Sequence, residues 1–217
     1  MNPPSVTIKQ TDDFEITGEG TSIEWAMACP VELTRIQHGP QMKTTARMLY
    51  SATGIYFLME CEDGILTCTK TEDFDNLFLE DVVEVFLQPE RRHPVYLEYE
   101  ASPLQKELPI LVSNNGNGFY GWLPWNYRDA RKCHLLTSVR GGYKQPFAPC
   151  SGWSAEFFIP FALMAGLTGA PPVPGSLWHG NLYRIDYDNG EAAHYAWAPV
   201  SGASFHDIAN FGLFHFA

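Results

Sequence analysis

Short runs of apolar residues recur along the whole chain, often alternating with polar ones, and turn-forming residues separate them. The runs at 82–87 (VVEVFL) and 95–100 (VYLEYE) are rich in β-branched and aromatic residues, which is typical of strands. Two further runs, 45–50 and 55–59, flank an SATG turn and predict a β-hairpin. The DNG sequence at 188–190 lies between two aromatic runs and predicts a second hairpin.

Strand-like runs separated by turns, rather than by long helices, predict an all-β chain. We expect an antiparallel β-sandwich of two packed sheets, jelly-roll or immunoglobulin-like, with one or two short helices, one of them near 160–166. The length of 217 residues favours a single domain over 1–217. The other runs assigned to strands are 135–139, 153–159, 182–187, 195–197 and 211–216.

Alternation within two of these strands separates an apolar face from a mixed one. The mixed face carries Glu84 in the strand at 82–87, and Glu98 and Glu100 in the strand at 95–100, each next to aromatic residues. If the two strands are neighbours in one sheet, these faces form a single surface of carboxylates and aromatic rings. A solvated outer face of the sheet is the alternative interpretation.

The charge balance excludes several classes of partner. Lysine and arginine number 14 against 25 aspartates and glutamates, a formal charge of -11. Nucleic acid and anionic lipid need a basic face, so neither nucleic acid nor membrane is an expected partner. No apolar run approaches the roughly 20 residues of a membrane span. The N-terminal sequence shows no signal-peptide pattern, which favours a cytoplasmic chain unless a leader was removed. The oligomeric state stays open.

Aromatic residues make up 14% of the chain and suggest a ligand with flat apolar faces. Sugar rings have such faces and a rim of hydroxyls, so their sites combine aromatic platforms with planar hydrogen-bonding groups. Trp197 in YAWAP and Trp125 in GFYGWLPWNYR lie near proline and glycine, and we expect both at the ligand. Glu84, Glu98 and Arg184 would orient the hydroxyls. The alternatives are tryptophans that fill the core and an ion pair of Arg184 with Asp186.

Catalytic and metal motifs give less support. Two of the carboxylates Asp81, Glu84, Glu98 and Glu100 could cleave a glycosidic bond, which makes a glycoside hydrolase the main alternative to a binding protein. The histidines form no HxxxH or HxH spacing, and no GxSxG or phosphate-binding glycine motif is present. The five cysteines include no CxxC motif and are expected to be reduced.

Five segments together carry a family resemblance: DVVEVFL (81–87), YLEYEASP (96–103), WSAEFFIPFALM (153–164), GNLYRIDYD (180–188) and YAWAP with FHDIANFGLFHF (195–199 and 205–216). Their order and spacing resemble the carbohydrate-binding module family 9-like domains, over roughly residues 40 to 217. The resemblance implies a β-sandwich that binds an oligo- or polysaccharide without catalysis, in xylan or glucan breakdown, and that carries structural calcium.

The same resemblance implies roles for individual residues. Trp197 matches the family's tryptophan near the C-terminus, and Glu84 matches the glutamate of its D-x-x-E-V-F strand. Phe78 stands where the family has a second stacking tryptophan, and the family's sugar-binding arginine has no counterpart. These departures make the chain more similar to the stand-alone branch of the family. A related group binds haem through methionine or lysine, so haem bound by Met42, Met48 or Met59 is a further alternative, with core methionines as the simpler explanation.

Overall fold

Strands dominate the computed structural model, which describes residues 3–125, 127–202 and 204–217. The strands are β1 (Ser5–Gln10), β2 (Val31–Glu32), β3 (Thr34–Arg35), β4 (Thr44–Tyr50), β5 (Gly54–Cys61), β6 (Val82–Gln88), β7 (Val95–Ala101), β8 (Glu107–Asn114), β9 (Phe119–Pro124), β10 (His134–Arg140), β11 (Gly152–Pro160), β12 (Leu177–Asp186), β13 (Ala193–Ala196) and β14 (Gly212–Phe216). The prediction of an all-β chain is therefore confirmed.

Helical structure is limited to short 3-10 segments in the described part of the chain. These are η1 (Ile23–Met27), η2 (Leu77–Leu79), η3 (Asp129–Arg131), η4 (Asp188–Gly190) and η5 (Ile208–Asn210). The predicted helix near 160–166 is instead a pair of tight turns, in which the backbone N–H groups of Leu163 and Met164 donate to the carbonyls of Pro160 and Phe161. Among the described residues, no helix has the length and apolar character needed to cross a bilayer.

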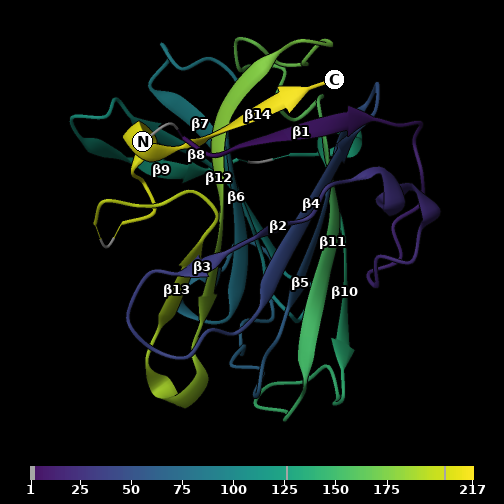
Figure 1. The fold of residues 1–217 in the computed structure, drawn as a ribbon, viewed down its shortest axis with the longest axis vertical. Coiled ribbons are helices and arrows are strands. Elements are labelled where there is room, and N and C mark those ends of the chain that lie inside the picture. The colour runs from purple at the N-terminus through teal and green to yellow at the C-terminus, as the bar shows by residue number, and fades with distance from the viewer. Residues whose placement is uncertain (1–2, 126, 203) are drawn as a thin grey trace.

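The strands form one curled sheet (Figure 1). Eleven of them follow the order β10-β11-β5-β4-β1-β14-β12-β6-β7-β8-β9, while β13 pairs with β12 and β3, and β2 pairs with β4. The two arms of the sheet, β10 to β4 and β12 to β9, meet at β1 and β14. Strand β1 runs parallel to both of its neighbours, with Val6 opposite Phe214 and Lys9 opposite Leu49. The sheet is therefore mixed, which corrects the expectation of purely antiparallel strands. Alternation reveals which face of a strand is buried but not which strand lies beside it. The sequence pattern therefore could not predict that β1 lies parallel between β14 and β4.

Both predicted hairpins are present. Strands β4 and β5 pair antiparallel, with Tyr50 opposite Ile55 around the SATG turn. Strands β12 and β13 pair antiparallel around the DNG sequence, which forms η4. Local turn chemistry was sufficient for these two connections because each turn joins strands that pair directly with each other.

The two arms face each other across the main hydrophobic core, which gives a β-sandwich-like arrangement. Val83, Val85 and Leu87 from β6 point into this core, and so do Leu97 and Tyr99 from β7. The alternate residues of the same strands form a second cluster on the outer face of the β12–β9 arm. The predicted division of β6 and β7 into two faces is thus confirmed, and the strands are neighbours in the sheet.

Candidate functional site

Three glutamates occupy the centre of the outer face of the β12–β9 arm. Glu84 of β6 lies directly opposite Glu100 of β7, and Glu98 of β7 lies opposite Phe86 of β6. Residues of like charge that face each other across a strand pair repel, so this arrangement costs free energy unless something compensates it. A cavity of about 450 Å³ is lined by all three glutamates, and we call it the glutamate pocket.

Burial is the main influence on the ionisation of these carboxyls. The exposed fractions of Glu84, Glu98 and Glu100 are 2%, 4% and 0%. Burial raises the pKa of Glu84 to about 8. Burial and the neighbouring carboxylates raise the pKa of Glu98 and that of Glu100 well above their ordinary range. The alternative interpretation of a solvated outer face therefore does not describe this part of the sheet.

Aromatic side chains from three separate segments surround the three glutamates. Phe78 comes from η2, Trp122 comes from β9, and Tyr187 directly follows β12. The rings of Phe78 and Trp122 meet edge to face, with centroids 6.3 Å apart. A hexose ring has apolar C–H faces, and half-buried aromatic rings of this kind offer them a platform. The remaining lining residues are Leu79, Phe86, Ile110, Phe119, Ile185, His194, Ser204, Phe205 and His206.

The pocket holds hydrogen-bonding groups but no permanent positive charge. No lysine or arginine belongs to the described residues that line it. The nearest candidate cation is His206, whose Nδ1 is 3.8 Å from Glu98 and also shares a 2.6 Å hydrogen bond with the Tyr96 hydroxyl. A nearby carboxylate should raise the pKa of a histidine, but burial outweighs it here and lowers the pKa of His206 to about 4. His206 is therefore neutral at ordinary pH.

The structure brings together three of the six residues expected at the ligand. Phe78, Glu84 and Glu98 all line the glutamate pocket. The other three, Trp125, Arg184 and Trp197, do not line it. Their predicted part in sugar binding stays a prediction, and each has a different environment.

Trp197 lies on the opposite face of the sheet from the glutamates. Its neighbour Ala196 belongs to the outer cluster, whereas Tyr195 and Trp197 pack towards the main core. The Trp197 ring stacks on Phe214, with centroids 5.4 Å apart and an interplanar angle of 13°. It remains half-buried rather than sealed inside the core.

Trp125 follows β9 and lies beside the turns after β11. Its indole N–H donates to the carbonyl of Leu163 at 2.9 Å. It borders a separate cavity of about 260 Å³ together with Leu111 and Leu167. This hydrogen bond satisfies the one polar atom of the indole, as expected for a structural tryptophan.

Trp122 is an aromatic residue of the pocket that was not among the six expected from the sequence. It lies three residues before Trp125, in the same GFYGWLPWNYR segment. Trp122 pairs with Val112, which belongs to the outer cluster, and this register directs it towards the glutamates. Extending the alternation argument from β8 into β9 would have identified it, whereas the loop residues Tyr187 and His206 follow no such periodicity.

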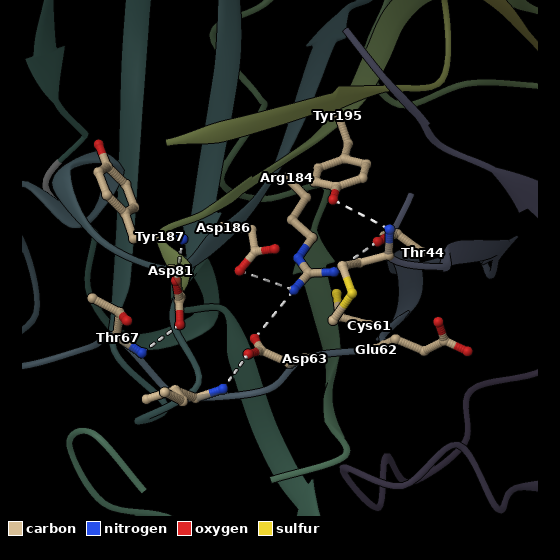
Figure 2. Close-up of polar contacts among 12 residues, drawn as sticks. Thr44, Cys61, Glu62, Asp63, Thr67, Asp81, Arg184, Asp186, Tyr187 and Tyr195 are labelled. Carbon is tan, nitrogen blue, oxygen red and sulfur yellow. Dashed lines mark hydrogen bonds and ion pairs between the residues drawn. The ribbon is translucent and has the colours of Figure 1, made fainter. Parts of the chain in front are cut away.

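Arg184 lies in a second buried polar cluster, between β5, β6 and β12 (Figure 2). Its guanidinium donates to Asp63 at 3.1 Å and to the Thr44 hydroxyl at 3.0 Å, and lies 3.5 Å from Asp186. Its side chain has no exposed surface. The ion pair with Asp186, which the sequence left open beside a ligand contact, is therefore present.

The same cluster contains oxygen ligands suited to calcium, which the family resemblance implies. Asp63, Asp81 and Asp186 each offer a carboxylate oxygen, and these three oxygens lie within 4.8 Å of one another. Burial raises the pKa of Asp63 to about 6 and that of Asp81 to about 8, with neighbouring aspartates adding to both. Buried oxygens of Asp186 and Asp188 make no hydrogen bond within the described part of the chain. A hard cation that prefers oxygen fits this set, and Asp63, Asp81 and Asp186 would hold it.

Other cavities and side chains do not combine the predicted chemistry. A larger cavity of about 870 Å³ lies between the N-terminal segment and β10, lined by Phe14, Tyr56 and His134 among others, but by none of the six expected residues. The haem alternative gains no support from the methionines, because Met48 and Met59 are buried in the main core and Met42 packs against it. The glutamate pocket is therefore the candidate functional site.

Comparison with known proteins gives a consistent result for the fold. No protein-family model matches the chain, and no curated protein does so. A solved structure from Bacteroides uniformis, of a protein to which carbohydrate binding has been attributed, superimposes with a TM-score of 0.80 at 15% identity and covers 100% of both chains.

Two solved structures of a carbohydrate-binding module family 9 protein from Caldicellulosiruptor kristjanssonii are also similar. The complex with cellotriose has a TM-score of 0.67 at 14% identity, covering 98% of this chain and 93% of that one. The complex with glucose has a TM-score of 0.64 at 15% identity, covering 98% and 95%. The chain therefore has the fold of the family 9 carbohydrate-binding modules.

Proposed function

We propose that this chain binds carbohydrate without catalysing a reaction, and that the glutamate pocket is its sugar site. The observation that carries the proposal is the convergence of half-buried aromatic rings, Phe78 and Trp122, on buried carboxyls in one cavity. Rings provide a platform for the apolar face of a sugar, and carboxyls accept hydrogen bonds from its hydroxyls. The similar fold of modules solved with cellotriose and glucose supports the same function.

The proposal assigns stacking to Trp122 and Phe78, and hydrogen bonding to Glu84 and Glu98. A half-open pocket of about 450 Å³ admits the end of a saccharide chain rather than a long segment of polymer. Such sites bind with micromolar to millimolar dissociation constants, on the order of -4 to -8 kcal/mol. Polysaccharide breakdown of the xylan or glucan type is the proposed context.

Titration calorimetry with cellotriose and glucose tests the sugar site. Trp122→Ala should weaken binding by about 10-fold or more, because a stacking platform contributes on the order of 1–2 kcal/mol. Trp197→Ala serves as the matched comparison, since Trp197 lies on the other face of the sheet and its loss should leave the isotherm unchanged. The expectation from the sequence is the reverse, with Trp197 as the platform. Loss of binding in Trp197→Ala alone, on a folded sample, would move the site away from the glutamate pocket.

A glycoside hydrolase is the second candidate, favoured by one observation. A general acid must stay protonated near neutral pH, and burial raises the pKa of Glu84 to about 8 beside two further carboxyls. Incubation with aryl glycosides and with xylan or glucan decides between the candidates. Turnover that disappears in Glu84→Gln supports the hydrolase, whereas binding without turnover supports the binding module.

A further inference from the structure

The glutamate pocket contains more carboxyl groups and more unpartnered acceptor oxygens than a neutral sugar needs. Glu98 Oε2 and both side-chain oxygens of Glu100 are buried and have no hydrogen-bond partner within the described part of the chain. Both side chains are more than nine-tenths buried, and both line the cavity. A buried acceptor without a donor costs free energy, so these oxygens point to a group supplied from outside.

The surroundings of the three carboxyls supply no compensating charge. The titratable groups that face them are Tyr96 of β7, Tyr183 of β12, Tyr187 after β12, His194 of β13 and His206. Burial lowers the pKa of His194 below its ordinary value, and burial lowers the pKa of His206 to about 4, so neither is positively charged at pH 7. Burial also raises the pKa values of the three tyrosines, so none of these groups adds a positive charge.

The aromatic walls favour a cation of a particular kind. Phe78, Trp122 and Tyr187 present ring surfaces at the cavity, and ring faces attract an ammonium group. An ammonium group also supplies N–H donors for unpartnered carboxylate oxygens, whereas a hydroxyl supplies only one O–H. A bare metal ion fits less well, because the only group of three or more acidic, histidine or cysteine residues with ligand atoms within 4.8 Å of one another in the described residues is Asp63, Asp81 and Asp186.

We propose that the glutamate pocket selects a sugar unit that carries a protonated amine, held by Glu98 and Glu100 with Glu84 beside them. The inference rests on the proposed sugar binding and narrows its ligand class from neutral hexoses to amino sugars. The ammonium group donates to the unpartnered oxygens of Glu98 and Glu100, while Trp122 and Phe78 contact the ring. Binding of the cation makes the carboxyls release protons that they hold in the empty pocket.

The test compares three β-1,4-linked trisaccharides that differ only at C2: a glucosamine trimer, an N-acetylglucosamine trimer and cellotriose. At about pH 6 a sugar amine resembles an α-amino group and is largely protonated. We expect the glucosamine trimer to bind the wild-type protein about 10-fold or more tightly than either neutral trimer. Calorimetry in two buffers of different ionisation enthalpy should report proton release for the glucosamine trimer only.

Glutamate-to-glutamine variants test which carboxyls give the preference for the amine. Glu98→Gln and Glu100→Gln should each weaken binding of the glucosamine trimer far more than binding of the two neutral trimers, so that most of the preference for the amine is lost. Glu107→Gln is the matched control, because Glu107 is a buried glutamate of β8 that bonds Tyr99 and Tyr127 and does not line the pocket. Thermal melting of each variant confirms folding before binding is compared.

Each other outcome overturns a defined part of the argument. Cellotriose that binds as tightly as the glucosamine trimer would overturn the amine preference and leave the proposed sugar binding intact. Failure of all three trimers to bind would overturn both. A lysine-containing tripeptide that binds more tightly than the glucosamine trimer would show that the pocket selects amines without a sugar. If Glu107→Gln reduced the preference for the glucosamine trimer as much as Glu98→Gln does, the amine would not bind in the glutamate pocket.

Discussion

Glu156 and Glu84 are both buried glutamates, one on the outer face of each arm of the sheet, but their hydrogen-bonding environments differ. Glu156 of β11 accepts hydrogen bonds from the backbone N–H groups of Thr17, Gly18 and Gly20 and from the indole of Trp25, which ties the N-terminal segment to the β10–β4 arm. Beside Glu84 on the other arm, Glu98 and Glu100 have buried oxygens that accept no hydrogen bond from the described part of the chain. The first environment stabilises the folded chain, and the second stores unfavourable free energy at a ligand site.

The stability of the protein should therefore fall as the pH rises across the titration of the pocket. The folded-state pKa of Glu84 is about 8, above the roughly 4.3 of an exposed glutamate. Between these values the folded protein holds more protons than the unfolded chain, so the free energy of unfolding decreases with pH. Asp81, with a pKa of about 8, and Asp63, with a pKa of about 6, act in the same direction.

The variant Glu84→Gln tests the contribution of one residue to this pH dependence of stability. At about pH 8 the variant should be more stable than the wild type by on the order of 3 kcal/mol, because glutamine never ionises, and near pH 4 the difference should vanish. Urea denaturation at both pH values measures it. Glu156→Gln is the control and should lower stability, since an amide cannot accept all of the bonds made by Glu156. A Glu84→Gln variant that is no more stable than the wild type at about pH 8 contradicts the pKa assignment.

At the level of elements, β1 should contribute strongly to stability, because the two arms of the sheet are joined through it. Ile8 has no exposed surface and packs in the main core, while β1 pairs with β14 on one side and β4 on the other. Removing atoms from such a side chain leaves a cavity that a strand held on both sides cannot close by moving.

Ile8→Ala should lower the free energy of unfolding by about 2–4 kcal/mol. Urea denaturation of the full chain measures the change. The neighbouring Lys9 is exposed, so Lys9→Ala should change stability by less than about 0.5 kcal/mol. An effect of Ile8→Ala no larger than that of Lys9→Ala would mean that the junction contributes little to stability.

Sequence reasoning succeeded where local alternation and turn chemistry determine the structure. The two faces of β6 and β7, and the placement of Glu84 and Glu98 on the same face, follow from period-two patterning within the strands. The same pattern puts Tyr195 and Trp197 on one face but cannot reveal that this face is the inner one. The contribution of Phe205 and His206 to the pocket depends on how a loop folds over the sheet, and loops carry no periodicity from which that could be predicted.

At the level of the whole molecule, a concentration of acidic groups near the main core accompanies the net charge of -11. Asp63, Asp81 and Asp186 surround a single buried cation, Arg184, with their oxygens close together. Three carboxylates exceed one guanidinium in charge, so a divalent cation at this place would relieve repulsion in the folded state and have no comparable site in the unfolded chain.

Calcium should therefore raise the melting temperature of the protein. At a concentration about 100 times its dissociation constant, a ligand stabilises the folded state by about 2.7 kcal/mol, which corresponds to about 5–10 °C for a chain of this size. Differential scanning calorimetry with calcium and with a chelator measures the shift. Asp186→Asn should reduce the shift, and Asp73→Asn, at an exposed aspartate, should preserve it. Equal melting temperatures with calcium and with chelator would exclude this role for the cluster.

The parallel pairing of β1 with β14 also has a consequence for how the protein acquires its structure. Ser5 lies opposite Leu213, so the junction between the arms joins positions near opposite ends of the chain. Contacts of such wide sequence separation form slowly because a large loop must close before they are gained. During synthesis the two arms stay unjoined by β1 until β14 has emerged, and the sheet is exposed to aggregation through its unpaired strand edges in that interval.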